Sequence, residues 1–365
     1  MIMKHILTIL FGALMLLQPL RGQEPVKIGV AGLSHSHVLQ LLRNLDRTDI
    51  KIVGIAESDQ DLARRYAERF GFDPALVYDD LETMLDRTEP EGVVTFTSIY
   101  DHLEVVQACA SRGIHVMVEK PLAVSVNHAE QIEQLAEQHG IMVYTNYETT
   151  WYPANHEVFR MIGENKLGTL RKMIVYDGHR GPREINVNEE FLAWLTDPVK
   201  NGGGAVTDFG CYGADLVTWI MGGQKPESVY GSLKQYKPRV YPHVDDDATL
   251  ILSYPSMECI IHASWNWPFS RKDMHVYGTT GYVFQDDAVT LRYRLDRESR
   301  EQTRTVPRSA IRHTDPFTYF SGLVRGTITP DPTDPGSLQI NKTVVEILEA
   351  ARESNKTGQK IMLTP

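Results

Sequence analysis

The chain has 365 residues, a net charge of −10 at neutral pH and a hydrophobic content of 42%. This length suffices for two domains with buried cores, and the acidic excess argues against nucleic acid or an anionic membrane as a partner. Its three cysteines, Cys109, Cys211 and Cys259, lie far apart without a CxxC pair. We therefore expect buried structural thiols rather than metal ligands or redox centres.

The first 22 residues are typical of a secretory signal peptide. Lys4 and His5 precede an apolar run from Ile6 to Leu17, and Gly22 is a small residue near the expected cleavage point. The apolar run is short for a membrane span. We predict a secreted, periplasmic protein with no membrane contact after cleavage; an uncleaved anchor is the alternative.

From residue 23 to residue 145, strand and helix patterns alternate. Apolar runs predict strands at Val26–Ala31, Ile50–Ala56, Gly92–Thr97, His115–Val118 and Ile141–Thr145. Helical spacing falls between them, at Val38–Leu45, Leu62–Phe70, Leu103–Arg112 and Ala129–His139. Such alternation predicts a parallel sheet covered on both faces, and we interpret 23–145 as a Rossmann dinucleotide-binding domain.

The turn after the first strand carries an incomplete dinucleotide-binding pattern. In G-x-G-x-x-G, Gly32 takes the first position, Ser34 the second and His37 the third. The backbone N–H groups of such a turn suit a pyrophosphate. Glu57, at the end of the second strand, can accept hydrogen bonds from ribose hydroxyls and would repel a 2′-phosphate. We therefore predict NAD rather than NADP; a plain strand–helix turn is the alternative.

Further cofactor contacts are expected where parallel strands end, because ligands bind at that edge. We assign Thr97, His102, Glu119 and Lys120 to this set. His35 and His37 lie in a turn with no matching acid or third histidine nearby in the sequence. We expect them to contact phosphate or backbone, and we predict no metal site.

The pattern changes after residue 145, where short strands with turns between them predict one large open, mostly antiparallel sheet. The strands are expected at Leu170–Tyr176, Val229–Tyr236, Ala248–Tyr254, Glu258–Trp265, His275–Gly278 and Tyr282–Gln285. A helix from about Thr207 should pack on this sheet, and a last helix is expected at Leu338–Glu353. The fold class is thus α/β, with a C-terminal α+β domain over 146–365 for substrate binding and oligomerisation.

The open sheet and its flanks suggest two further features. The exposed face of such a sheet usually needs cover, so we expect a homodimer or homotetramer. The acidic run Asp245–Asp247 is expected to be a solvated start of a strand.

Lys120 and Tyr212 are the predicted proton-transfer pair. Lys120 lies in Glu119-Lys120-Pro121 at a strand end, and Asp208 and Tyr212 should share one face of the helix after Gly202–Gly204. A protonated amine beside a phenol lowers the pKa of the phenol. Tyr212 would then exchange the proton, Lys120 would hold the phenolate, and Asp208 would orient the site. A structural role for Asp208 and Tyr212 is the alternative.

Aromatic and basic side chains near this helix are predicted to contact substrate. Apolar faces of sugars stack on aromatic rings, although large aromatics are more often core residues. The substrate contacts that we predict are Trp151, His179, Arg180 and Trp194.

Taken together, these segments resemble the Gfo/Idh/MocA family, which includes glucose-fructose oxidoreductase, inositol dehydrogenase and dihydrodiol dehydrogenase. The resemblance rests on Glu57, Glu119-Lys120-Pro121, the Gly202–Tyr212 segment, Val244–Ala248 and Tyr277–Tyr282. It implies a Rossmann domain, a second domain with a large open sheet, and a nicotinamide cofactor between them. Many members have histidine in place of Tyr212; glucose-fructose oxidoreductase and dihydrodiol dehydrogenase use tyrosine, as here.

These features predict an exported NAD(P)-dependent oxidoreductase that transfers hydride between the cofactor and a secondary alcohol of a sugar or polyol. Free nicotinamide cofactor is scarce outside the cytoplasm, so we expect one tightly retained molecule. Two alternatives stay open. One is an NAD-dependent glycosidase that oxidises its sugar transiently, and the other is a non-catalytic sugar-binding protein on the same scaffold.

Overall fold

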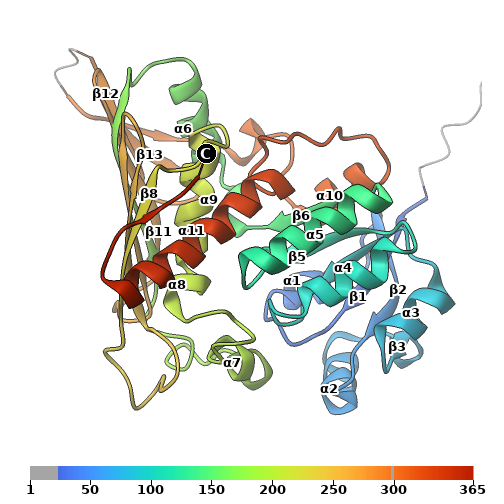
Figure 1. Ribbon diagram of the computed structural model, residues 1–365. Coiled ribbons are helices and arrows are strands. Elements are labelled where there is room, and N and C mark those ends of the chain that lie inside the picture. Colours follow the sequence, from blue (N-terminus) through green and yellow to red (C-terminus); the bar gives the residue numbers. More distant parts are fainter. Residues whose placement is uncertain (1–23, 297–299, 365) are drawn as a thin grey trace, which may run out of the picture.

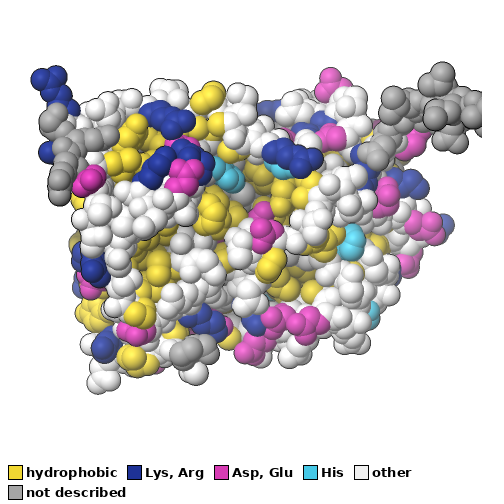
Figure 2. Space-filling model, turned by 90° about the horizontal axis from the view of Figure 1, so that it is seen from above, with side chains coloured by type: hydrophobic (Ala, Val, Ile, Leu, Met, Phe, Trp, Pro, Cys, Tyr) yellow, Lys and Arg dark blue, Asp and Glu magenta, His cyan; other side chains and the backbone are white. Residues whose placement is uncertain are grey.

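The computed structural model describes residues 24–296 and 300–364, so the predicted signal peptide lies outside the described residues. Two β-sheets, one of six strands and one of nine, organise this part of the chain (Figure 1). Within it, no helix combines the length and apolar character needed to cross a bilayer. Figure 2 shows acidic and basic side chains interspersed on the face that it presents, with hydrophobic side chains gathered between them.

The six-stranded sheet is parallel, with strand order β3-β2-β1-β4-β5-β6. Its strands are β1 (Val26–Ala31), β2 (Ile50–Ala56), β3 (Val77–Tyr78), β4 (Gly92–Thr95), β5 (His115–Glu119) and β6 (Val143–Asn146). The helices between them are α1 (Val38–Leu42), α2 (Gln60–Phe70), α3 (Leu81–Thr88), α4 (His102–Ala110) and α5 (Val126–His139). The order reverses between β1 and β4, where open α/β sheets bind ligands at the carboxyl ends of their strands. The predicted Rossmann fold is confirmed.

Local sequence signals set the helix limits here. The Asp59 carboxylate accepts hydrogen bonds from the backbone N–H groups of Asp61 and Leu62 and so starts α2, and Gly71 ends it in the left-handed conformation. The two-residue strand β3 and the short helix α3 were not predicted, because both are too short for their periodicity to stand out.

The nine-stranded sheet has the order β14-β13-β12-β11-β7-β10-β9-β8-β15. Only β7 and β10 pair in parallel, which confirms a mostly antiparallel sheet. Its strands are β7 (Leu170–Gly178), β8 (Ser228–Lys234), β9 (Asp247–Ser253), β10 (Glu258–Ser264), β11 (Arg271–Gly278), β12 (Gly281–Gln285), β13 (Thr290–Leu295), β14 (Gln302–Thr305) and β15 (Ile361–Met362).

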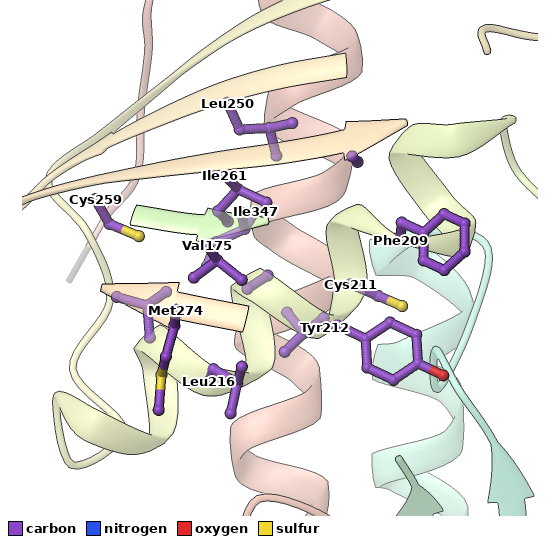
Figure 3. Close-up of a cluster of buried hydrophobic side chains, with 14 of the residues drawn as sticks. Val175, Phe209, Cys211, Tyr212, Leu216, Leu250, Cys259, Ile261, Met274 and Ile347 are labelled. Carbon is purple, nitrogen blue, oxygen red and sulfur yellow. The ribbon is translucent and has the colours of Figure 1, made fainter. Parts of the chain in front are cut away.

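Helices cover one face of this sheet (Figure 1). The helices of this half are α6 (Pro153–Gly163), α7 (Glu189–Leu195), α8 (Ala205–Asp208), α9 (Gly210–Ile220), α10 (Pro316–Val324) and α11 (Leu338–Thr357). Figure 3 shows strand residues such as Val175 and Ile261 packed with Leu216 of α9 and Ile347 of α11. Burial of these apolar side chains is what holds the helices on the sheet. The three cysteines are buried and free, as predicted.

Helix α10 returns the chain to the first sheet. Phe317, Phe320 and Leu323 belong to the same hydrophobic cluster as Ile28 of β1. Arg47 pairs with Asp315 at 2.7 Å, just before α10 begins. A segment from the second half of the chain thus completes the core of the first sheet, which the sequence pattern did not indicate.

Candidate active site

A cavity of about 480 Å³ lies at the carboxyl ends of β1, β2 and β4, and we call it the nucleotide cavity. Gly32, Ser34, Glu57 and Thr97 all line it, as the sequence predicted. Gly32 has a φ of +79°, and a Cβ there would lie 2.7 Å from Cγ2 of Thr97. Only glycine combines a favourable positive φ with the absence of a Cβ that would clash here.

The turn after Gly32 leaves backbone donors for a ligand. The Ser34 hydroxyl donates to the Phe96 carbonyl at 3.3 Å and accepts from Nε1 of Trp194 at 3.1 Å, so it is held by the protein. Among the described residues, the backbone N–H groups of Ser34 and Ser36 donate no hydrogen bond. Two unpaired N–H groups in one turn fit the pyrophosphate of a dinucleotide.

Glu57 holds this turn to the start of α2. Its two carboxylate oxygens accept from the backbone N–H of Leu33 at 2.8 Å and of Asp59 at 2.9 Å. Each oxygen keeps a further lone pair for a ligand hydroxyl. Burial raises the pKa of Glu57, although these backbone hydrogen bonds oppose the shift.

The charge of the nucleotide cavity is strongly one-sided. Besides Glu57, its acidic wall residues are Asp79, Asp80, Asp101, Glu104, Glu190 and Asp197, against the single base Lys200. Such a wall tolerates ribose hydroxyls but repels an additional phosphate. The residues present therefore fit NAD better than NADP.

A second cavity, of about 410 Å³, lies between the end of β5 and the nine-stranded sheet, and we call it the central cavity. Lys120, Asp208, Tyr212, His179 and Lys272 are among its wall residues. The sequence predicted the first four of these and missed Lys272. The cavity brings together the predicted catalytic residues, which come from β5 and from α8 and α9.

Lys120 and Asp208 form a buried ion pair. Nζ of Lys120 lies 2.6 Å from Oδ1 of Asp208 and donates to the Asp208 carbonyl at 2.9 Å, and Nε1 of Trp265 donates to Oδ2 at 3.0 Å. Burial opposes both charges, but each ion favours the other. The pKa of Lys120 is therefore raised and that of Asp208 lowered. Trp265 is a fully buried core residue that anchors this acid.

Tyr212 sits beside this pair but is not activated by it. Nζ of Lys120 lies 5.1 Å from the centroid of the Tyr212 ring, and Nζ of Lys272 lies 4.1 Å from it. Its hydroxyl makes no hydrogen bond within the described residues. In Figure 3 the phenol oxygen points away from the aliphatic cluster.

The predicted lowering of the pKa of Tyr212 is wrong. Burial raises this pKa well above its usual value, and the carboxylates of Glu148 and Asp177 add to the effect. The physical reason is that Asp208 neutralises Lys120 at contact distance, so little positive charge is left to favour phenolate. The expected single helix is also broken, because α8 ends at Asp208 and α9 begins at Gly210.

Sequence reasoning missed a second charged group around the tyrosine. Nζ of Lys272 donates to Glu148 at 2.5 Å, and the Tyr152 hydroxyl donates to the same carboxylate at 2.6 Å. Burial opposes the charge of Glu148, but Lys272 lowers its pKa to about 2. Asp177, opposite Lys272 in the sheet, is buried with Oδ1 unpartnered, and burial raises its pKa.

Glu119 does not line either cavity; it positions a histidine. Its carboxylate lies 2.8 Å from Nδ1 of His37 and accepts from Asn146 at 3.0 Å. The sequence argument against a metal assumed no acid near His35 and His37, and that premise is wrong, since the ligand atoms of these three residues lie within 4.8 Å of one another. However, Nδ1 of His35 accepts the His37 backbone N–H, so the proton of its neutral ring occupies Nε2. The prediction of no metal stays a prediction.

Other predicted residues lie elsewhere. His102 is buried, with Nδ1 3.1 Å from the Leu122 carbonyl, and is not a wall residue of the nucleotide cavity. Arg180 is exposed and away from the central cavity. Trp194 lines the nucleotide cavity instead, and Trp151 lines smaller neighbouring cavities. Only Arg180 follows a strand; His102 and Trp194 lie in the helices α4 and α7, whose packing the sequence does not specify.

The acidic run was also misinterpreted. Asp245 accepts from the backbone N–H groups of Gly204 and Val206, and Asp246 accepts from those of Tyr236 and Lys237. These acids fix loops at the sheet edge rather than facing solvent. Asp245 thereby holds the glycine turn in front of α8, which carries Asp208.

Comparison with known proteins agrees with this architecture. Residues 26–147 match the family model described as oxidoreductase family, NAD-binding Rossmann fold, and residues 156–284 match the GFO/IDH/MocA C-terminal domain. A trans-1,2-dihydrobenzene-1,2-diol dehydrogenase of Bos taurus is 26% identical over 254 residues, covering 69% of this chain and 70% of the relative. The Homo sapiens protein of the same name is 25% identical over 255 residues, 69% and 71% of the two chains.

Solved structures show the same fold. An aldose-aldose oxidoreductase from Caulobacter crescentus, complexed with glycerol, has a TM-score of 0.78 at 17% identity, covering 93% of this chain and all 100% of that one. An inositol dehydrogenase homolog from Azotobacter vinelandii, complexed with NAD+, has a TM-score of 0.79 at 18% identity, covering 94% and 98%. Both likenesses extend over the two sheets.

Proposed function

Because the chain belongs to the Gfo/Idh/MocA family of NAD-binding oxidoreductases, we propose that it transfers hydride between NAD and a secondary alcohol of a sugar or polyol. The observation that carries this proposal is the convergence of Lys120, Asp208 and Tyr212 on one cavity of about 410 Å³. The names of its relatives support the substrate class, since a dihydrodiol, an aldose and an inositol all carry hydroxyls on adjacent carbons.

NAD supplies the hydride acceptor when it is bound. The N–H group of Ser34, in the wall of the nucleotide cavity, and that of Ser36, in the wall of the central cavity, would hold the pyrophosphate, and Glu57 would accept from the ribose hydroxyls. Gly32 leaves the backbone open for close approach. The residues of this turn thus bind and orient the cofactor, and they take no part in proton transfer.

Lys120 would hold the reacting oxygen. Asp208 occupies two of its donor directions, at the carboxylate and at the carbonyl, so one N–H of the ammonium remains for substrate. Because Asp208 keeps the amine protonated, Lys120 donates a hydrogen bond to that oxygen rather than accepting a proton from it. Asp208 is therefore a positioning residue for Lys120.

Tyr212 is the group with a free hydroxyl for proton exchange. Its raised pKa keeps the phenol protonated near neutral pH, so it is ready to donate a proton to a carbonyl oxygen in the reductive direction. In the oxidative direction it must first lose its proton. His179, whose Nδ1 accepts the Gly181 N–H at 2.9 Å, carries its proton on Nε2 when neutral and is suited to orient a substrate hydroxyl.

The direct test is a spectrophotometric assay of NAD reduction with a panel of aldoses, inositols and linear polyols. We expect turnover with at least one of them, strongly reduced in Tyr212→Phe. Tyr236→Ala, which truncates an aromatic that is 66% exposed on a turn, is the control and should keep full activity. If the protein binds NAD but turns over none of these alcohols or the matching ketoses and lactones, the proposal fails.

We propose further that the protein is a homo-oligomer through the uncovered face of the large sheet. Along β9 and β10 the side chains alternate, and Ile251 and Ile260 point away from α9 and α11 with neither helix over them. Tyr230 on β8 adds an aromatic that is 41% exposed. Ile260→Asp should shift the molar mass measured by light scattering toward the monomer, whereas an unchanged mass would place the interface elsewhere.

The segment before residue 23 supports a proposal of export with a retained cofactor, although it lies outside the described residues. Fractionation of cells that express the full chain tests the location. Mass spectrometry of the nucleotide released from purified protein tests the retention. A cytoplasmic, nucleotide-free protein would contradict both parts.

A further inference from the structure

The central cavity does not end at Tyr212. A cavity of about 220 Å³ adjoins it, and the two share His37, Glu148 and Tyr152 as wall residues. A further cavity of about 370 Å³ shares Trp151 and Pro153 with the second. We call these two adjoining cavities the side groove.

The side groove is roofed by the segment that joins the two sheets. Residues 306–316 run from β14 to α10, across the top of Figure 1 in orange. Arg308 and Asp315 of this segment line the nearer cavity, and Ile311 and Arg312 line the farther one. The groove therefore adjoins the central cavity at His37, Glu148 and Tyr152, and its walls come from both halves of the chain.

The walls of the groove are rigid aromatic and charged groups. Nε1 of Trp151 donates to Oδ1 of Asn146 at 3.0 Å, which fixes the indole. The Tyr152 hydroxyl is fixed by Glu148 at 2.6 Å, and Lys272 holds Glu148 from its other side. Aromatic rings beside a fixed carboxylate suit a ligand with both an apolar ring face and hydroxyls.

Glu148 marks the junction between the two spaces. It lines both the central cavity and the nearer part of the groove, and Lys272 keeps it ionised. A charged acceptor at this point can take hydrogen bonds from hydroxyls on either side of a glycosidic link. The central cavity is already large enough for a small ligand by itself, because binding pockets begin at ~300 Å³.

We propose that the substrate is a disaccharide or other glycoside, with the reacting sugar in the central cavity and a second glycosyl unit in the side groove against Trp151. This inference rests on the proposed function, since it assigns the reacting unit to the cavity of Tyr212. It adds a specificity site that the hydride-transfer chemistry does not require. Trp151, which the sequence predicted as a substrate contact, would contact the second unit rather than the reacting one.

The test compares paired substrates on the NAD-loaded enzyme. Lactose, cellobiose, maltose and trehalose are measured beside glucose and galactose. We expect kcat/KM for the best disaccharide to exceed that of its component sugars by tenfold or more. Trp151→Ala should lower kcat/KM for that disaccharide about tenfold, mainly through KM, and leave the monosaccharide value within about twofold. Trp151→Phe should retain most of the activity.

Arg308→Ala provides a second variant whose folding is not at risk, because the side chain is exposed. It should raise KM for the disaccharide alone, and Tyr236→Ala should change neither substrate. Two results would contradict a second glycosyl site in the side groove and leave the proposed function intact. One is turnover of monosaccharides as fast as of every disaccharide, and the other is an equal effect of the variants on both kinds of substrate. Disaccharide binding in calorimetry that Trp151→Ala weakens, without any hydride transfer, would support the groove and contradict the proposed function.

Discussion

In the nucleotide cavity a single turn supplies the backbone donors for a ligand, whereas in the central cavity side chains from distant segments supply the polar groups. Gly32, Ser34 and Ser36 are neighbours in sequence, and Glu57 ties their turn to the next strand. Lys120 follows β5 of the first sheet and Asp208 ends helix α8 in the second half of the chain, so they meet only when the two halves pack together. The turn of the first cavity is thus a local structure, whereas the ion pair of the second depends on the tertiary fold.

The two cavities also differ in charge. The nucleotide cavity has seven acids in its wall and Lys200 as the only base there, and of these acids Glu190 pairs with Arg65 outside the wall at 3.7 Å. The central cavity pairs its charges at contact distance, Lys120 with Asp208 and Lys272 with Glu148. The acids of the nucleotide cavity repel a ligand that carries an extra phosphate. In the central cavity a ligand meets lysine donors whose charge is already balanced by a carboxylate. Each variant below perturbs one cavity and leaves the other as a control.

Breaking the Lys120–Asp208 pair should have the largest effect. Lys120→Met leaves Asp208 buried without its cation, which costs on the order of 3–5 kcal/mol when a buried pair loses one partner. We expect a large fall in melting temperature and loss of turnover. The double variant Lys120→Met with Asp208→Asn should regain much of the stability in thermal unfolding but none of the activity. Equal stability of the single and double variants would show that the pair does not stabilise the fold.

Tyr212→Phe should impair the central cavity and leave NAD binding in the nucleotide cavity unchanged. It removes only a hydroxyl that no described residue bonds, so stability should stay within about 1 kcal/mol. Turnover should fall on the order of a hundredfold or more, because proton transfer by a positioned group is worth that much. Calorimetry should find NAD binding unchanged. Retained turnover would return Tyr212 to a packing role.

The raised pKa of Tyr212 sets the pH dependence of the two directions. Oxidation of the alcohol needs the deprotonated phenol, whose fraction grows as pH rises toward this pKa. Its rate should therefore climb through the alkaline range, about tenfold per pH unit while the phenol is mostly protonated. Reduction uses the protonated phenol and should stay level until the same pKa is reached. An oxidation rate that levels off near pH 7 would indicate that Tyr212 is not the base.

Gly32→Ala should damage only the nucleotide cavity. A Cβ would lie 2.7 Å from Cγ2 of Thr97 and would sit on a backbone with φ of +79°. The strain is on the order of 1–3 kcal/mol, and we expect NAD affinity to fall about tenfold or more in a titration. Adding Thr97→Ser removes the atom in contact and should recover part of the affinity. Full recovery would mean that the backbone conformation contributes nothing.

Glu57→Gln should have the smallest effect. The amide keeps one oxygen acceptor for the turn but removes a negative charge from an acidic wall. We expect the preference for NAD over NADP to narrow several-fold, which titration of both nucleotides can measure. Turnover at saturating NAD should not change. If the ratio of NAD affinity to NADP affinity stays the same, the other acids of the cavity wall discriminate between the two nucleotides.

The same contrast explains what the sequence could predict. The turn at Gly32 and the acid Glu57 were found because their spacing is local, and the cavity at these residues agrees. Lys120, Asp208 and Tyr212 were correctly brought together. The pKa of Tyr212 was not correctly predicted, because Lys120 pairs with Asp208 rather than with the phenol. That pairing depends on how the two halves of the chain pack together.

Lys272 and Glu148 show why the rest was missed. Lys272 reaches the site because β11 runs antiparallel to β7, which places it opposite Asp177 in the sheet. No sequence spacing encodes that register, and a lysine in a strand is ordinarily a solvent-exposed residue. Arg180 and Trp194 were misplaced for a related reason, since the first follows β7 and the second lies in α7, and tertiary packing alone decides which cavity each faces.

The return of α10 to the first sheet has a consequence for how the protein is made. When only β1 to β6 have left the ribosome, Gly92 of the first sheet is not yet covered by the ring of Phe320. In the folded protein this ring is so close that a Cβ at Gly92 would lie 2.9 Å from it. The nascent nucleotide-binding half therefore keeps an apolar surface uncovered until translation is nearly complete. We therefore expect the first sheet to complete its core only after the ribosome has synthesised α10.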